Sequence, residues 1–342
     1  MLTISHEDIV KSGGFNIPQA IDVTQKALLA FEAERILYPD KVSQIFDEST
    51  QNRINCLPAT LFDDKVCGMK WVAVFPTNPT LHGLPNLNAT ILLSEIETGY
   101  PIAIMDATLC SDLRTAAISA VAARYLAKEN AQVIGYIGAG EQARMNFLAM
   151  MSVRPSIKTC KVASRTSASE QRFIEQMKQF YPQVEFVACN SVYEKAATES
   201  DIIVTAISAQ LPLLQASWVK PGAFYSHVAG WEDAYDVPLS MDKIVCDSWE
   251  SAKHRTQTIS RLYKMGRLTD DDIYADLPEI VAGKKGREFD SEKIYFNSVG
   301  LSYVDVALGY QLYQQVKDNG LGYKMDLYQK SVFDINPNQV VL

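Results

Sequence analysis

The sequence predicts an α/β protein in which a doubly wound parallel sheet is joined to a second region of α+β type. From residue 133 onward, short apolar strands alternate with helices, which is typical of a parallel sheet. A glycine-rich turn follows the first of these strands. Residues 40–110 instead hold closely spaced strands separated by turn residues, a pattern that favours an antiparallel sheet.

The elements follow from hydrophobic periodicity and turn residues. Residues 1–35 predict a short strand and a helix that opens at Pro18. We expect strands over 42–46, 53–58, 66–74, 88–93 and 102–106, with a hairpin turn over 95–101. A helix with a small-residue face is expected over 114–127. Beyond it we expect strands over 133–137, 159–163, 185–188, 202–205, 223–228 and 243–245, and helices over 141–151, 168–180 and 302–316.

Composition narrows the class of protein. The chain has 342 residues, which fits two domains, and 47% of them are hydrophobic. The net charge is −8, and the basic residues form no cluster, so neither nucleic acid nor membrane is an expected partner. The apolar runs are too short to span a bilayer, and the N-terminus has no secretion-signal pattern.

The cysteines and histidines indicate no disulfide framework and no metal site. The six cysteines contain no C-x-x-C pair, which predicts reduced thiols in a cytoplasmic protein. The four histidines form no H-x-x-x-H pair, so we expect no bound metal.

The turn after the first strand of the parallel region carries the pattern G-x-G-x-x-A. Gly138 would allow the tight turn, Gly140 would let a pyrophosphate approach the backbone, and Ala143 would keep the next helix close to the strand. The start of that helix offers free N–H groups and the positive end of its dipole to phosphates. We therefore predict a Rossmann-type dinucleotide site that includes Ala139, Glu141 and Gln142. A structural glycine turn in another α/β protein is the alternative.

The end of the second strand indicates which dinucleotide binds. Proteins that bind NAD usually have an acidic residue there for the ribose hydroxyls. This chain has Ser164, Arg165 and Thr166 instead, which can bind a 2′-phosphate. NADP(H) is therefore favoured over NAD(H). Alternatively, Arg165 stacks on the adenine or belongs to a solvated loop.

Four cations lie in or beside the apolar strands of the first region: Lys41, Arg53, Lys70 and Arg114. A charge in apolar surroundings needs a partner. A substrate carboxylate would supply one. The competing explanation is an internal salt bridge, for instance to Asp106.

Three segments, in this order and spacing, resemble the ornithine cyclodeaminase/μ-crystallin family: residues 98–106, 114–120 and 138–143. Residues 218–223 and the stretch from Gly300 to Asp305 are similar to later segments of the family. The resemblance implies a homodimer with a substrate-binding and dimerisation domain over residues 1–114 and 302–342. It also implies an NAD(P)-binding Rossmann domain over 115–301.

The resemblance also assigns roles by position. It places Lys70 and Arg114 at the substrate carboxylate and imine, with Lys41 near a family arginine. It places Thr115 at the cofactor phosphates and Thr205, Ala206 and Ile207 on the adenosine side. Ser164, Arg165 and Thr166 resemble the N-R-T of NADPH-binding members, and Arg114 and Gly300 are also expected in the cofactor site.

One segment departs from the family pattern. Cyclodeaminases carry an aspartate that acts as the catalytic base, and this chain has Trp231 in its place. Glu232 and Asp233 follow directly after Trp231. Both acids are candidates for the catalytic acid/base, and solvated loop charges are the alternative. His227 is a second candidate, although a single histidine is more often structural. Residues 247–249 and 297–300 resemble segments of the opine-type members.

The leading hypothesis is an NAD(P)-dependent oxidoreductase that acts on the C–N bond of a small amino acid, imine or opine, with hydride transfer at the α-carbon. Catalysis would use Lys70 with Glu232 or Asp233, and the substrate would contact Lys41, Arg53, Lys70 and Arg114. The alternatives are a redox-neutral ornithine cyclodeaminase that retains NAD and a non-enzymatic binding protein of μ-crystallin type.

Overall fold

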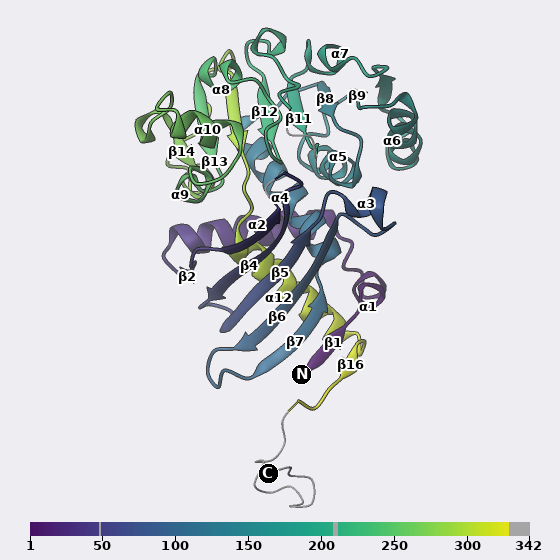
Figure 1. Cartoon of the computed structure of the whole chain (residues 1–342), viewed down its shortest axis with the longest axis vertical. Helices are drawn as coiled ribbons and strands as arrows, with labels where there is room; N and C mark the ends of the chain where they lie inside the picture. Colours follow the sequence, from purple (N-terminus) through teal and green to yellow (C-terminus); the bar gives the residue numbers. More distant parts are fainter. Residues whose placement is uncertain (48, 208–210, 328–342) are drawn as a thin grey trace, which may run out of the picture.

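The computed structural model describes residues 1–47, 49–207 and 211–327, which form two eight-stranded sheets with helices packed around them (Figure 1). The first sheet has the order β16-β1-β7-β6-β5-β4-β2, and β3 also pairs with β4. Its pairings are antiparallel except for β1 with β7. Its strands are β1 (Leu2–Ile4), β2 (Ile36–Leu37), β3 (Val42–Asp47), β4 (Asn52–Leu61), β5 (Val66–Val74), β6 (Leu87–Glu95), β7 (Pro101–Asp106) and β16 (Tyr323–Lys324).

One face of the first sheet is covered by helices. Alternate residues of the central strands point to this face, where Leu57, Lys70 and Ile91 lie directly across from one another on β4, β5 and β6. Helix α12 (Ser302–Asp318) packs on these strands, and α2 (Ile17–Glu32) and α4 (Thr108–Leu126) pack against it. Lys70 is thus a charged residue in an apolar layer.

The second sheet is entirely parallel, with the order β10-β9-β8-β11-β12-β15-β13-β14. Helices on both faces bury its central strands, which explains their continuous apolar sequences. The strands are β8 (Val133–Ile137), β9 (Thr159–Ala163), β10 (Glu185–Ala188), β11 (Ile202–Thr205), β12 (Phe224–His227), β13 (Lys243–Cys246), β14 (Ala275–Asp276) and β15 (Ile294–Asn297). The predicted α/β class with a doubly wound parallel sheet is confirmed.

The remaining helices are mostly short. Beside the parallel sheet lie α5 (Glu141–Val153), α6 (Ser167–Phe180), α7 (Tyr193–Ala197), α8 (Asp236–Leu239), α9 (Trp249–Ala252), α10 (Thr258–Lys264) and α11 (Leu277–Val281). Near the first sheet lie α1 (His6–Lys11) and α3 (Asn78–Leu81). No helix among the residues that the structure describes is long and apolar enough to cross a membrane.

Helix α4 connects the two halves of the molecule. It begins at Thr108 rather than at the predicted residue 114, and Asp106, which precedes the helix, accepts a hydrogen bond from the backbone N–H of Thr108 (3.1 Å). α4 packs against α2 and α12 on one side and against α5 on the other. The expected boundary between residues 114 and 115 therefore falls inside a helix. Residues 328–342 of the expected C-terminal part lie outside the described residues.

Candidate active site

The glycine turn has the geometry of a phosphate cradle. Gly138 has φ +116°, and a Cβ there would lie 2.4 Å from the carbonyl oxygen of Ala206. Gly140 precedes α5, and among the described residues no side chain caps the helix and no heavy atom lies within 4 Å of the position that a Cβ would take. The free N–H groups of a thirteen-residue helix therefore face open space, which fits a pyrophosphate.

The side chains around this turn contact protein groups. Gln142 donates a hydrogen bond to Asp112 Oδ1 (2.5 Å), and Glu141 forms an ion pair with Arg144 (2.5 Å). Ala139 and Ala143 are buried against the sheet. The backbone, rather than these side chains, is available to a phosphate.

The predicted 2′-phosphate region is organised by Glu170, a buried residue that sequence reasoning missed. Its carboxylate accepts hydrogen bonds from the backbone N–H groups of Ser164 (2.9 Å), Asn190 (2.8 Å) and Ser191 (2.8 Å). Thr166 caps α6 through the N–H of Ser169. Arg165 is exposed, and no ion pair joins it to another residue in the described part of the chain. Its guanidinium is thus available to an anionic ligand.

Lys70 and Arg114 meet at Asp305, which projects from α12. Lys70 Nζ lies 2.5 Å and Arg114 Nε 3.0 Å from Asp305 Oδ1, and both Lys70 and Asp305 are fully buried. The guanidinium of Arg114 passes over Gly300 so closely that a Cβ there would lie 2.6 Å from Nη1. Predicted cations from β5 and α4 are therefore brought together. Asp106, suggested as their internal partner, instead contacts His6 and Thr108.

This cluster has unusual electrostatics. Burial and the neighbouring charge of Arg114 lower the pKa of Lys70 to about 8, although Asp305 opposes the shift. Burial raises the pKa of Asp112, near the same two cations, to about 6. Asp305 Oδ2 is buried and receives no hydrogen bond from the described residues. The cluster thus holds two cations on one carboxylate, which retains a free acceptor.

Asp247 connects the two segments that resemble the opine-type members. It accepts hydrogen bonds from the N–H of Val299 (2.9 Å), the N–H of Gly300 (2.8 Å) and the hydroxyl of Ser298 (3.0 Å). Because Gly300 supports Arg114, Asp247 also fixes the surface beneath that guanidinium.

The other predicted cations are not brought into contact with Lys70. Arg53 donates to the carbonyl of Gln51 (2.9 Å), and burial lowers its pKa. Lys41 lies just before β3 and is half-buried. A cation that the prediction missed, Arg255, has a buried Nε with no hydrogen-bond partner among the described residues. Its loop adjoins Tyr38, whose hydroxyl bonds Ser251 (3.1 Å) and whose pKa burial raises to about 12.

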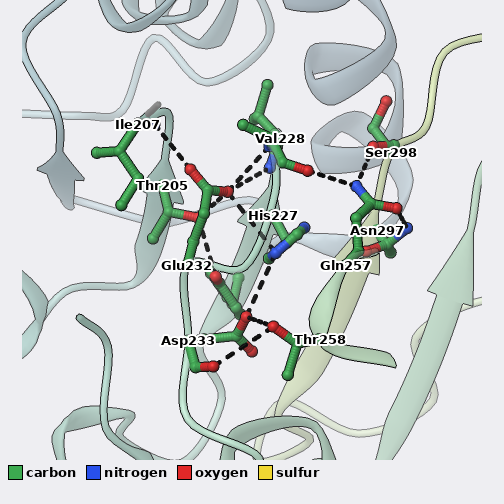
Figure 2. A network of polar contacts seen from close by, with 12 residues as sticks. Thr205, Ile207, His227, Val228, Glu232, Asp233, Gln257, Thr258, Asn297 and Ser298 are labelled. Atoms are coloured by element: carbon green, nitrogen blue, oxygen red, sulfur yellow. Dashed lines mark hydrogen bonds and ion pairs between the residues drawn. The ribbon is translucent and has the colours of Figure 1, made fainter. Parts of the chain in front are cut away.

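Glu232 and Asp233 are fully buried, so the interpretation as solvated loop charges is wrong. Figure 2 shows both carboxylates pointing into a polar network at the ends of β11 and β12. Glu232 contacts Thr205 and Ile207, two of the residues predicted on the adenosine side. Thr115, predicted at the phosphates, is buried in α4 and donates its hydroxyl to the carbonyl of Ser111 (2.8 Å).

The chain was compared with known proteins. The model of the ornithine cyclodeaminase/mu-crystallin family matches residues 6–320. N-((2S)-2-amino-2-carboxyethyl)-L-glutamate dehydrogenase of Staphylococcus aureus is 28% identical over 333 residues, which cover 96% of this chain and 99% of that protein.

Two solved structures extend the likeness. Thermococcus litoralis Δ1-pyrroline-2-carboxylate reductase in complex with NADH and L-proline is 30% identical, with a TM-score of 0.89 and coverage of 95% of this chain and 100% of that one. An archaeal alanine dehydrogenase dimer with bound NAD is 29% identical, with a TM-score of 0.87 and coverage of 96% and 99%. The extent of the family match shows that this chain belongs to the ornithine cyclodeaminase/mu-crystallin family.

Proposed function

We propose that the protein is an NAD(P)-dependent oxidoreductase that acts on a C–N bond of an amino acid, imine or opine, with hydride transfer at the α-carbon. The arrangement of Lys70, Arg114 and Asp305 carries this proposal. Two cations share one carboxylate oxygen, and the second oxygen is a buried, free acceptor. An α-amino or α-imino acid supplies the complement, a carboxylate for the cations and an N–H for Asp305.

The relatives support this reading of the site. The similar proteins are named as dehydrogenases and a reductase, and the two solved structures are described with NADH or NAD. A bound nicotinamide would supply the hydride acceptor or donor. The open glycine turn at the start of α5 would hold its pyrophosphate.

Each residue of the cluster has a role in this proposal. Arg114 binds the substrate carboxylate and fixes the α-carbon. Lys70 exchanges a proton at the substrate nitrogen, since a pKa near 8 lets both of its forms exist close to neutral pH. Asp305 orients Lys70 and accepts the substrate N–H. The acid/base role predicted for Asp233 stays a prediction, and for Glu232 we propose a different role.

In the oxidative direction a bound oxidised dinucleotide would accept the α-hydrogen as a hydride, that is, together with both electrons of the Cα–H bond. The substrate nitrogen loses one proton to Lys70, and a C=N bond forms. Water then adds to this bond, which yields a 2-oxo acid and an amine, whereas a cyclic imine can leave intact. The reductive direction reverses these steps.

For the cofactor we propose a preference for NADP(H), which depends on Ser164, Arg165 and Thr166 alone. An exposed guanidinium beside a helix start suits a 2′-phosphate. The NAD(H) of the solved relatives is the competing choice. Titrating the protein with NADPH and NADH in parallel decides between them.

We also propose that the protein is a homodimer. Its substrate-binding and dimerisation domain would comprise residues 1–114 and 302–342, and its Rossmann domain residues 115–301. The archaeal alanine dehydrogenase is described as a dimer. On the outer face of the first sheet, Trp71 and Val42 remain 40% and 60% exposed, and both lie opposite Cys56. Light scattering would give the mass in solution. The cytoplasmic location expected from the sequence stays a prediction.

The deciding experiment is a substrate panel. Purified protein is assayed with NAD(P)H and 2-oxo acids plus amines or cyclic imines, and with NAD(P)⁺ and amino acids or opines. We expect turnover with at least one class and a loss of about 100-fold or more in R114A, since the carboxylate clamp is removed. Ammonia release from ornithine without net NAD(P)H formation would indicate a cyclodeaminase. Binding without turnover on any substrate would indicate a μ-crystallin type of protein.

A further inference from the structure

Glu232 occupies a position that suits a structural link better than an acid/base. Its side chain has no exposed surface and lies where the strands β11 and β12 end (Figure 2). Strand β11 ends at Thr205, and β12 ends at His227. The loops that follow parallel strands at this edge form the ligand site of doubly wound sheets.

The carboxylate of Glu232 joins both loops. Oε1 accepts the N–H of Ile207 (2.7 Å), from the loop after β11, and Oε2 accepts the hydroxyl of Thr205 (2.8 Å), the last residue of β11. Oε2 also accepts the N–H groups of Ala229 (2.9 Å) and Val228 (3.3 Å), from the loop after β12. Burial raises the pKa of Glu232 to about 7, and the four hydrogen bonds oppose that rise. The four donors also occupy the positions at which the carboxylate would receive a proton from substrate.

The link extends to the glycine turn. Ala206 lies between Thr205 and Ile207, both held by Glu232, and its carbonyl is the group against which Gly138 packs. The N–H of Ala206 donates to the carbonyl of Ile137 (3.0 Å), at the end of β8. A shift of Glu232 would therefore move the backbone on which the predicted phosphate turn rests.

The groups that face Glu232 do not make it a proton relay. His227 lies 3.7 Å from it, and burial lowers the pKa of His227 to about 3, so the imidazole is neutral. Asp233 faces Thr258 (2.5 Å), His227 (3.3 Å) and Tyr295 (3.5 Å), and Tyr225 bonds Thr205 (2.9 Å). These residues are themselves fully buried.

We propose that Glu232 is a positioning residue that holds residues 205–207, at the end of β11, and residues 228–229, after β12, in the shape that binds the dinucleotide, and that it does not exchange protons with substrate. The inference rests on the proposed function, because it assumes that a dinucleotide binds at this edge of the sheet.

The test compares E232Q with D236N. Glutamine keeps the size of the side chain but places an NH₂ group against an N–H or hydroxyl donor. We expect the Kd and KM for the dinucleotide to rise about 10-fold or more in E232Q. The pH profile of kcat/KM for the amino substrate should keep its shape. Asp236 is exposed and close in sequence, so D236N removes the same charge and should change none of these values.

Two results would overturn the proposal. In one, E232Q keeps the Kd of the parent protein while kcat falls by about 100-fold and one limb of the pH profile disappears, which is the behaviour of an acid/base. In the other, E232Q changes nothing.

If E232Q does not fold, amide hydrogen exchange in the parent protein still tests the link through Glu232. In the parent protein the amides of Ile207 and Ala229 should exchange slowly, and rapid exchange of both would refute the link. Failure of the parent protein to bind any nicotinamide dinucleotide would instead refute the proposed function, and the exchange of these amides would still report on Glu232.

Discussion

The pKa of Lys70 near 8 gives the proposed mechanism a direct test. In the oxidative direction the neutral amine accepts the proton, so kcat/KM should rise with pH and level off above about 8. At about pH 6 roughly one lysine in 100 is neutral, so kcat/KM should be about 100-fold below its plateau. In the reductive direction the ammonium form is required, so the dependence reverses and the rate falls above about pH 8.

The structure also predicts how this profile moves. The carboxylate of Asp305 raises the pKa of Lys70, in opposition to burial and Arg114. D305N removes that charge, so the midpoint of the profile should shift to lower pH. Initial rates followed by NAD(P)H absorbance give both midpoints. A midpoint that stays in place or rises in D305N, or a profile that survives in K70A, would refute the assignment of this limb to Lys70.

Three further predictions concern the frame of the site. G138A should lower the Tm, because a left-handed φ and a Cβ 2.4 Å from the carbonyl oxygen of Ala206 cost about 1–3 kcal/mol or more. G140A should keep the Tm and weaken NAD(P)H binding. The same Tm for both variants would contradict this prediction. D247N should destabilise the protein to denaturant by about 2 kcal/mol, because the N–H groups of Val299 and Gly300 lose a buried acceptor, and the exposed D271N is its control. R165A should weaken NADPH binding about 10-fold more than NADH binding, and an equal loss for both would remove the basis for an NADP(H) preference.

The fold could be predicted largely because its signals are local. The predicted strand 133–137 coincides with β8, and the predicted helix 302–316 lies within α12. Strand β15 (Ile294–Asn297) was missed, although it is as long as the predicted strands 185–188 and 202–205. The predicted start of helix α4 at residue 114 was too late, since the helix begins at Thr108.

The partners in the site were harder to predict than its residues. Lys70 and Arg114 could be chosen because charges in apolar sequence need partners. Asp305 lies 235 residues from Lys70 in the chain, and only the packing of α12 on β5 brings the two together. The burial of Glu232 could not be predicted either, since the groups that satisfy it are mostly backbone N–H groups, which every sequence position shares.

Helix α4 carries Arg114 and packs against α5, and its Asp112 accepts a hydrogen bond from Gln142 at the start of α5. The proposed carboxylate clamp and the proposed pyrophosphate cradle are therefore parts of one stiff unit. Any hinge motion that opens or closes the molecule must leave their separation nearly constant. The distance for hydride transfer is then set by the packing of α4 on α5. Residues elsewhere around the substrate can differ between members of the family. That separation of tasks offers a physical reason why one architecture occurs in both a Δ1-pyrroline-2-carboxylate reductase and an alanine dehydrogenase.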